Sequence, residues 1–552
     1  MQLEFRKLIL LGLLAFLVMT LFQRWTVFQQ ENIAQNAPAS NSEKLAEEIP
    51  QTPESTVEGL DSDAVPSSDT DEVADGKKVR VKTDLIIAEI DLNGGDITKL
   101  DLLKHPVSVK TPDQPFELLK KGGTDIFIAQ SGLIGKQDRQ YPNHKTEYKA
   151  EKLEYNLEPG TDEIKIKLNW KSPDNVNYNK IYTFKRDDYN LDVDFEIDNQ
   201  SQEQWQGYLY SQFQRSNVET EKFGFFGSPT YKGGVIYEPV EKYQKIDFGD
   251  IEKNKLNLTT DSGWVGMLQH YFVGAWLPQN QGPYQFYSKN INRSGQPLYN
   301  IGYKTTTALS IPPDAQGTLN SKAYIGTKEQ ERLKAQNIEG LILTVDYGWL
   351  TVIASPLFWV MSEIYKIVQN WGFTIVIVTI FLKLLFFPLS AASYKSMAKM
   401  KKFQPRLMTL RERYGDDKQK LNMEMMKLYK QEKINPMGGC LPILVQIPVF
   451  IALYWVLLES VELRQAPFIG WIKDLSLKDP YYVLPVLYGA SMFVMQKLNP
   501  APIDPMQQRI MTALPLVFTV MFLWFPSGLV LYWLVNNLLS MAQQWYITRK
   551  YA

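Results

Sequence analysis

Apolar and charged positions divide the chain into two parts. Beyond residue 366, four stretches of 17 to 39 positions carry at most one charge: 367–394, 434–458, 480–496 and 510–548. A helix needs about 20 apolar residues to cross the hydrocarbon core of a bilayer. The longest run exceeds one crossing, and Pro526 and Gly528 interrupt it with a tight turn. We therefore predict five spans, at 367–389, 438–458, 481–497, 510–526 and 528–547.

Residues 79–340 follow a different pattern, in which apolar and polar positions alternate. Residues 164–168 (IKIKL) and 191–195 (LDVDF) alternate strictly, as half-buried strands do. A Pro-Gly turn at 158–162 precedes the first of them. These features predict a large β-sandwich over 79–340. Its acidic residues fit solvated strand faces, and it carries no catalytic pattern.

The N-terminal segment has two interpretations. Residues 8–23 are uncharged and lie between Lys7 and Arg24. A cleaved signal peptide would use the Ala-Pro-Ala at 37–39 as its cleavage site. That site lies about 15 residues beyond the apolar run, which is far from the usual place. The sequence therefore favours an uncleaved transmembrane anchor at 1–28, with Trp25 at the interface.

An acidic linker is expected at 29–78, between the anchor and the sandwich. Residues 31–76 hold 12 acidic residues, one lysine and four prolines. Such a segment has too little apolar surface to offset the entropy lost on ordering, so we expect disorder.

Charge is distributed unevenly, although the whole chain has a formal net charge of −1. Residues 347–552 hold 21 Lys and Arg against 11 Asp and Glu. The loop 391–437 alone carries 12 basic and five acidic residues. Because positive loops stay cytoplasmic, both termini, this loop and the 498–509 loop are expected inside. Residues 29–346 and 459–480 are then outside, in a multi-pass protein with a short cytoplasmic tail at 548–552.

Residues 347–366 precede the first of these spans. Their apolar positions recur at about helical spacing, and Trp349 and Trp359 suit an interface. We predict an amphipathic helix in the outer interface; a simple connector is the alternative.

Metal and cofactor chemistry finds little support. Cys440 is the only cysteine, which excludes an intramolecular disulfide and cysteine-rich zinc sites. The three histidines are scattered. We expect no metal, no cofactor and no enzymatic activity.

Lys383 is the one charge within residues 367–394. It follows Trp371 by 12 residues, or about 18 Å along a helix, which places it in the inner half of the bilayer. A cation at mid-helix costs about 2.5–3.5 kcal/mol on insertion scales. Its ammonium could snorkel to the cytoplasmic interface. Because the predicted spans hold no Asp or Glu to pair with it, we favour a hydrated pocket.

Polar residues in other spans point to the same pocket. Thr379 lies one turn before Lys383, and Gln446 lies inside the second span of the core. One stripe of the last span holds Tyr532, Asn536, Ser540 and Gln543. Each of them alone could serve only to form hydrogen bonds between neighbouring helices. Together with an unpaired lysine they indicate a hydrated groove, open to cytoplasm and lipid, whose cation attracts acidic residues of an entering segment.

The loop 391–437 is predicted to be a cytoplasmic hairpin of two helices, 396–414 and 416–433. Its methionines are Met397, Met400, Met408, Met423, Met425, Met426 and Met437. Flexible methionine surfaces suit varied apolar partners, so we expect client contacts. The alternative is that they pack the interior of the hairpin, while its basic residues lie on anionic lipid.

Several strings in the second part resemble the YidC family of membrane protein insertases in its Gram-negative bacterial form. They are 396–400 (SMAKM), 415–419 (GDDKQ), 435–440 (NPMGGC), 462–468 (ELRQAPF), 479–482 (DPYY), 504–508 (DPMQQ) and 522–532 (FLWFPSGLVLY). The strings are in order and span residues 349–548.

The resemblance implies an inner-membrane insertase and chaperone that acts alone or beside the Sec translocon. It implies a periplasmic β-supersandwich and a five-helix core (367–547) with one further N-terminal transmembrane helix. The groove cation of the family, commonly Arg, corresponds to Lys383. Substrate-contacting positions correspond to Thr379, Gln446, Tyr532 and Trp533.

Implied partners are nascent membrane proteins, the Sec translocon with its accessory subunits, and membrane lipids, without direct nucleic-acid binding. The tail lacks the long basic extension with which some relatives bind ribosomes, so ribosome binding is expected to be weak.

Two other functions were weighed. A small-solute secondary transporter commonly shows internal repeats and broken helices around a midplane site, and we find no repeat. A membrane enzyme needs a nucleophile–base pair or a metal cluster, and the predicted spans contain no His, Asp or Glu.

Overall fold

The computed structural model describes residues 77–136, 139–218, 231–280, 282–293, 296–414, 417–432, 441–499 and 505–551. The expected anchor at 1–28 and nearly all of the expected linker lie outside the described residues. Residues 60–501 and 515–552 belong to one compact unit, and the contacts reported below lie within it.

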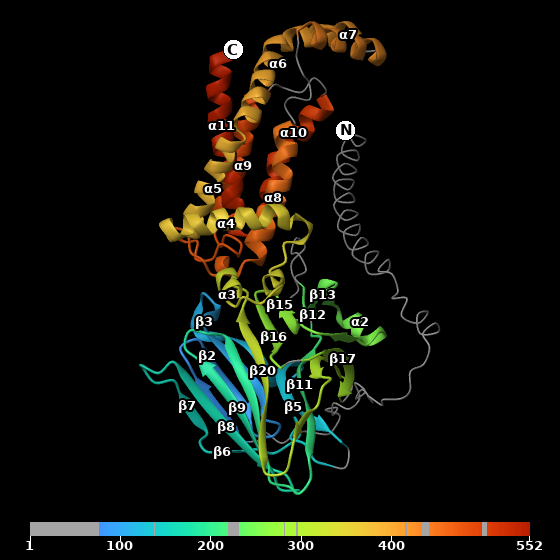
Figure 1. Ribbon diagram of the computed structural model, residues 1–552. Helices are drawn as coiled ribbons and strands as arrows, with labels where there is room; N and C mark the ends of the chain where they lie inside the picture. The colour runs from blue at the N-terminus through green and yellow to red at the C-terminus, as the bar shows by residue number, and fades with distance from the viewer. Residues whose placement is uncertain are drawn as a thin grey trace, which may run out of the picture. The chain divides into compact units, whose positions relative to one another are not determined.

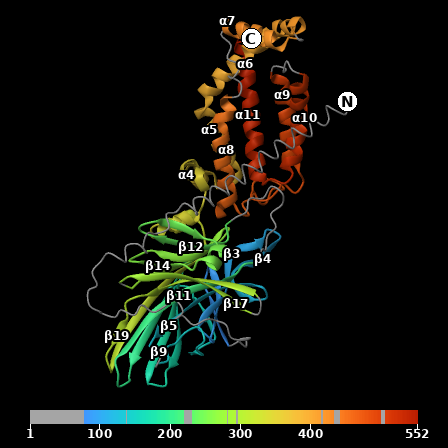
Figure 2. The same ribbon diagram turned by 90° about the vertical axis from the view of Figure 1, so that its right-hand side faces the viewer.

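An all-β domain of two sheets occupies the first part of the described chain, which confirms the all-β part of the predicted fold (Figures 1 and 2). The larger sheet has 11 strands: β14 (Asn257–Thr260), β17 (Tyr284–Arg293), β18 (Gln296–Thr305), β11 (Trp205–Ser216), β5 (Asp125–Gly135), β4 (Thr111–Gly122), β3 (Asp96–Ser108), β2 (Ile86–Asp91), β1 (Lys78–Lys82) and β7 (Glu154–Asn156) in that order, with β19 (Leu309–Ile311) paired to β11. The second sheet has nine: β13 (Lys242–Ile246), β12 (Gly233–Glu238), β15 (Trp264–Gln269), β16 (Phe272–Pro278), β20 (Ala315–Thr327), β10 (Asn190–Asn199), β9 (Val176–Lys185), β8 (Glu163–Lys171) and β6 (Lys149–Ala150).

Alternation in the sequence becomes burial on one face of a strand. In β8, Ile166 and Leu168 are fully buried while the lysines between and beside them are exposed. Contacts between the two sheets build the core, as where Phe213 of β11 meets Trp276 of β16 at 5.6 Å between ring centroids. The Ser211 and Ser321 hydroxyls, from β11 and β20, also lie 3.0 Å apart.

Helices make up the second part of the described chain, and short helices lie within the β domain or between the two parts. They are α2 (Phe248–Lys253), α3 (Gln330–Ala335), η3 (Leu341–Thr344), η4 (Gly348–Leu350), α4 (Thr351–Val368), α5 (Trp371–Leu385), α6 (Phe387–Tyr414), α7 (Lys418–Gln431), α8 (Leu441–Glu459), η6 (Val461–Leu463), α9 (Val483–Leu498), α10 (Pro505–Phe522) and α11 (Ser527–Tyr551). In Figure 1, α4 runs across the direction of α5 and α11.

Helix α6 begins earlier than the sequence predicts, at Phe387 rather than at residue 396. It follows α5 with a bend of 67° at Phe386. Pro388 lies in the first turn of α6, where its missing N–H leaves no helical hydrogen bond unmade. The predicted span at 367–389 and the first helix of the predicted hairpin are therefore two arms of one bent helix pair.

Few of the described helices are both long and apolar enough to cross a membrane. Gly348–Val368 meets the criterion alone, and the bent pair α5–α6 meets it if counted as one span. Shorter apolar helices cover Gln446–Glu459, Val483–Leu498 and Gln508–Phe522. Gly348–Val368 includes α4, which the sequence predicts to lie in the interface rather than to cross.

The loop between α8 and α9 ties three helix ends together. Asn370, the N-cap of α5, donates to the Phe468 carbonyl at 3.1 Å. At the start of α11, Ser527 N–H donates to Leu477 O at 2.7 Å and Gly528 N–H to Leu475 O at 3.0 Å. A buried Asp479 carboxylate accepts from Leu484 N–H at 2.8 Å in the first turn of α9. One loop therefore fixes the neighbouring ends of α5, α9 and α11.

Candidate functional site

Lys383 points into the helix bundle. Its side chain comes from the last turn of α5, the residue is 9% exposed, and Nζ donates to Ser540 Oγ of α11 at 2.7 Å. The adjacent Leu384 and Leu385 are 66% and 59% exposed, so the other side of the same turn is the outward one. Because successive helical residues point about 100° apart, a lysine among these leucines can face inward.

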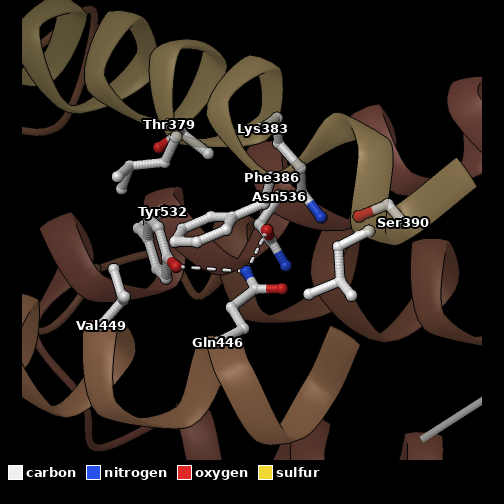
Figure 3. A pocket seen from close by; sticks show the side chains of 10 residues that line it. Thr379, Lys383, Phe386, Ser390, Gln446, Val449, Tyr532 and Asn536 are labelled. Carbon is white, nitrogen blue, oxygen red and sulfur yellow. Dashed lines mark hydrogen bonds between the residues drawn. The ribbon is translucent and has the colours of Figure 1, made fainter. Parts of the chain in front are cut away.

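A small cavity lies beside Lys383, where α5, α6, α8 and α11 meet (Figure 3). Its lining residues are Thr379, Leu382, Lys383, Phe386, Leu389, Ser390, Gln446, Val449, Tyr532 and Asn536. Its volume is about 20 Å³, which is room for about one water molecule. Six of the ten lining residues are polar or charged, which agrees with the polar positions seen in the sequence, but a polypeptide segment needs a wider space than this.

Hydrogen bonds link the polar side chains from different helices. Gln446 Nε2 of α8 donates to the Tyr532 hydroxyl of α11 at 3.2 Å and also to Asn536 Oδ1 (Figure 3). On α11, the Ser540 hydroxyl donates to Asn536 O at 2.7 Å. Thr379 uses its hydroxyl within α5, donating to Ile375 O at 2.6 Å. Buried polar groups are normally satisfied in this way.

The cavity lining carries positive charge only, because its ten residues include Lys383 and no acidic residue. The Ser540 hydroxyl accepts a hydrogen bond from the ammonium but cannot neutralise it. A carboxylate brought to the cavity would therefore be attracted to Lys383. A lysine beside a serine could suggest a nucleophile and its base. However, Ser540 is not among the lining residues, and no oxyanion-binding pair of N–H groups is aimed at its oxygen among the contacts of the described residues.

Most of the residues singled out by sequence meet at this place. Lys383, Thr379, Gln446, Tyr532 and Asn536 line the cavity, and Ser540 touches it through Lys383.

Trp533 lies elsewhere. Its ring packs on Phe450 at 4.6 Å and on Tyr488 at 6.1 Å, and it is not one of the lining residues. Trp533 follows Tyr532 by about 100° around α11, and this rotation directs its ring toward Phe450 and Tyr488 instead of the cavity.

The methionines of α6 and α7 are unequal in exposure. Met408, Met423 and Met426 are 57%, 54% and 51% exposed, whereas Met397, Met400 and Met425 are half-buried. Met437 lies outside the described residues. Exposure is compatible with the client-contact interpretation for the first three methionines, and partial burial is compatible with packing within the hairpin for the other three.

Ser390 is a lining residue that the sequence analysis missed. It is 5% exposed and belongs to α6, on the far side of the bend from Lys383. Its spacing of seven from Lys383 would have found it on a continuous helix. The sequence instead predicts a span that ends at 389 and a helix that begins at 396, with Ser390 between them.

Family models match both parts of the chain. The model of the YidC periplasmic domain matches residues 78–360, and that of the 60Kd inner membrane protein matches residues 363–552. A membrane protein insertase YidC from Methylobacillus flagellatus is 45% identical over 544 residues, covering 99% of this chain and 97% of the relative. One from Alkalilimnicola ehrlichii is 50% identical over 479 residues, covering 87% and 84%.

Solved structures include one described as an active YidC insertase with the first transmembrane domain resolved. It shares 17% sequence identity with this chain at a TM-score of 0.39, covering 86% of this chain and 93% of that chain.

Proposed function

The chain belongs to the YidC family of membrane protein insertases, and on that premise we propose that it inserts its clients through the polar cavity around Lys383. Relatives of this family are inner-membrane proteins with a periplasmic domain, so the β domain is the periplasmic domain. Membership of an insertase family leaves the solute-transporter alternative without support.

One observation carries the proposal: a buried ammonium and four further polar side chains from three other helices converge on one cavity that holds no carboxylate. Placing a polar segment in hydrocarbon is costly, and polar partners along part of the path lower that cost. Lys383 attracts the acidic residues of a client segment. Burial of the adjacent apolar segment in lipid then drives the step without a nucleotide.

The cavity must widen for this to happen. A space of about 20 Å³ admits about one water molecule. We propose that this arrangement is the closed state and that clients part α5 and α6 from α8 and α11. The loop between α8 and α9, which we expect outside, binds the first residues of α5 and α11. Because these helix ends are held together, we expect the helices to separate at their cytoplasmic ends.

The membrane arrangement proposed from the sequence is six spans with both termini in the cytoplasm and α4 in the outer interface. The basic loop 391–437 supports this orientation. The direction of α4, across α5 and α11, supports an interfacial position (Figure 1). Domain limits at 79–340 for the sandwich and 367–547 for the core belong to the same proposal.

Client capture is proposed for the cytoplasmic hairpin, where Met408, Met423 and Met426 are exposed. Nascent membrane proteins are the substrates that insertase function implies. Cooperation with the Sec translocon is carried over from the family resemblance.

Site-specific photocrosslinking to a ribosome-stalled nascent membrane protein tests the proposal. A photoreactive residue is placed at Thr379, Gln446 or Trp533, with Leu538 as a lipid-facing control because it is 49% exposed on α11. Positions 379 and 446 should crosslink to the client more strongly than 533, which lies in an aromatic cluster. Equal crosslinking from all four positions would mean that clients pass through lipid along the bundle and not through the cavity.

A further inference from the structure

The segment that follows α8 is held by the periplasmic domain at several points. At the last turn of α8, His270 Nε2 from the β15–β16 turn lies 3.0 Å from Leu458 O. Carbonyls in the last turn of a helix have no partner within the helix, so an outside donor satisfies one of them. A neutral imidazole with its proton on Nε2 supplies that donor.

A buried ion pair lies next to this contact. Lys328, directly after β20, approaches Glu459 to 3.7 Å, with side-chain exposures of 4% and 8%. Its ammonium also donates to Thr344 O at 3.2 Å. Removing one member of a buried pair leaves the other charge without compensation, whereas replacing both by apolar groups of similar volume is often tolerated.

Four further residues extend the contact along the chain. Glu462 accepts from the Gln330 N–H at 2.9 Å, and Gln330 Nε2 donates to the Tyr347 hydroxyl at 2.7 Å. That hydroxyl lies 2.9 Å from Ser460 Oγ, which returns to the segment after α8. Ser460 and Tyr347 are 1% and 2% exposed, so this end of the chain of hydrogen bonds is buried.

Arg464 completes the attachment at the β3–β4 hairpin. Its Nη2 donates to Pro106 O at 2.7 Å, and its guanidinium lies 5.7 Å from the Phe116 ring centroid and 5.8 Å from that of Phe272. A planar guanidinium can stack and donate at the same time, which a lysine cannot reproduce.

Helix α8 is also a wall of the cavity. Val449 lines it, and the neighbouring Phe450 packs on Trp533. Val449 precedes Glu459 by ten residues, or about 15 Å along the helix. No proline lies between them, since Pro448 comes before Val449. A displacement of the end of α8 therefore moves this wall as part of one rigid helix.

We propose that the periplasmic domain acts as a clamp on the end of α8, and that Lys328, Glu462 and Arg464 are positioning residues that set the place of the α8 wall relative to Lys383. The clamp keeps α8 fixed, so the other walls move when a client enters. The inference rests on the proposed function only in treating the cavity as the client site.

The test is a distance measurement in the full chain in lipid. After Cys440→Ser, spin labels are attached through Ile380→Cys on α5 and Ile447→Cys on α8, which are 39% and 43% exposed. Lys328→Met is compared with Lys180→Met. Both lysines are buried and donate to backbone carbonyls, but the partners that Lys180 binds, Gly95 and Ser131, lie within the β domain.

We expect both variants to lower the unfolding temperature. Only Lys328→Met should broaden the distance distribution between the labels and slow client insertion several-fold. The double variant Lys328→Met/Glu459→Met should restore the distribution, because no buried charge is then left alone. An unchanged distribution in Lys328→Met, with a loss of stability like that of Lys180→Met, overturns the clamp.

If Lys328→Met does not fold, the same distance measurement on Arg464→Lys tests the clamp. This variant keeps the positive charge but loses the planar guanidinium that lies over the two aromatic rings. A normal distribution there overturns the clamp. The distance readout needs no client, so a failure of the proposed groove and a failure of the clamp are distinguishable.

Discussion

Lys383 on α5 and Ser540 on α11 are joined by a hydrogen bond of 2.7 Å, although 157 residues separate them in the chain. The bond holds the ammonium toward the cavity and away from the exposed leucines beside it. A cation is thus kept inside the bundle by a neutral partner that leaves its charge uncompensated.

The charge of Lys383 should govern which clients are inserted. Lys383→Ala is expected to slow insertion of clients with acidic translocated segments by about tenfold or more, because a charge pair at 4 Å near a protein surface is attractive by about 4 kcal/mol. Clients with neutral segments should change little. Insertion into reconstituted vesicles, scored by protease protection, measures both. The control is Lys383→Arg, which keeps the charge, and equal slowing of both client types would contradict charge attraction.

Lys180 should stabilise the periplasmic domain by bridging its two sheets. Its ammonium, from β9, donates to Gly95 O and Ser131 O at 2.9 Å each, and the residue is fully buried. Lys180→Met should lower the free energy of unfolding by about 2–4 kcal/mol, because two buried carbonyls lose their donor. Hydrogen exchange at amides of β5 and β9 would report it. Wild-type protection in the variant would mean that water replaces the ammonium.

Acid should weaken the periplasmic domain through His144. Burial lowers the pKa of His144 to about 3, whereas histidine in an unfolded chain titrates near 6.5. Between these values the unfolded chain binds more protons, so the free energy of unfolding falls as the pH falls. This loss is about 2 kcal/mol between pH 7 and pH 5.

The variant His144→Gln should lack this part of the pH dependence, since glutamine can still bond to the Tyr210 hydroxyl, which lies 2.6 Å from His144 Nδ1. Denaturant unfolding at the two pH values gives the difference. Equal pH dependence in variant and wild type would assign the acid sensitivity to other groups.

Gly372 should be required for the close packing of α5 against the loop between α8 and α9. A Cβ at this position would lie 2.0 Å from Phe468 Cδ2 and 2.7 Å from Phe468 Cβ, so rotating the ring cannot relieve the contact. Gly372→Ala should therefore destabilise the core by about 1–3 kcal/mol, as overpacking does. Adding Phe468→Ala should recover part of this loss in thermal unfolding; no recovery would show that the strain lies elsewhere.

Local patterns predicted several elements of this protein correctly. Residues 164–168 and 191–195 alternate and lie in strands β8 and β10. A short turn at 523–526, which contains Pro526, separates α10 from α11 close to the place expected. The bend at Phe386 was not predicted, because a proline two residues later is equally compatible with the start of a separate helix.

By itself, the sequence determined that apolar helices carry one lysine and a stripe of polar residues, because composition and periodicity are properties of neighbouring residues in the chain. Only the tertiary structure decided which of them share a cavity, that Tyr532 faces it while Trp533 does not, and how little space it encloses. It alone brought Lys328 to Glu459 and Ser540 to Lys383. Such contacts depend on how each helix is rotated against its neighbours, and packing across the whole fold sets that rotation.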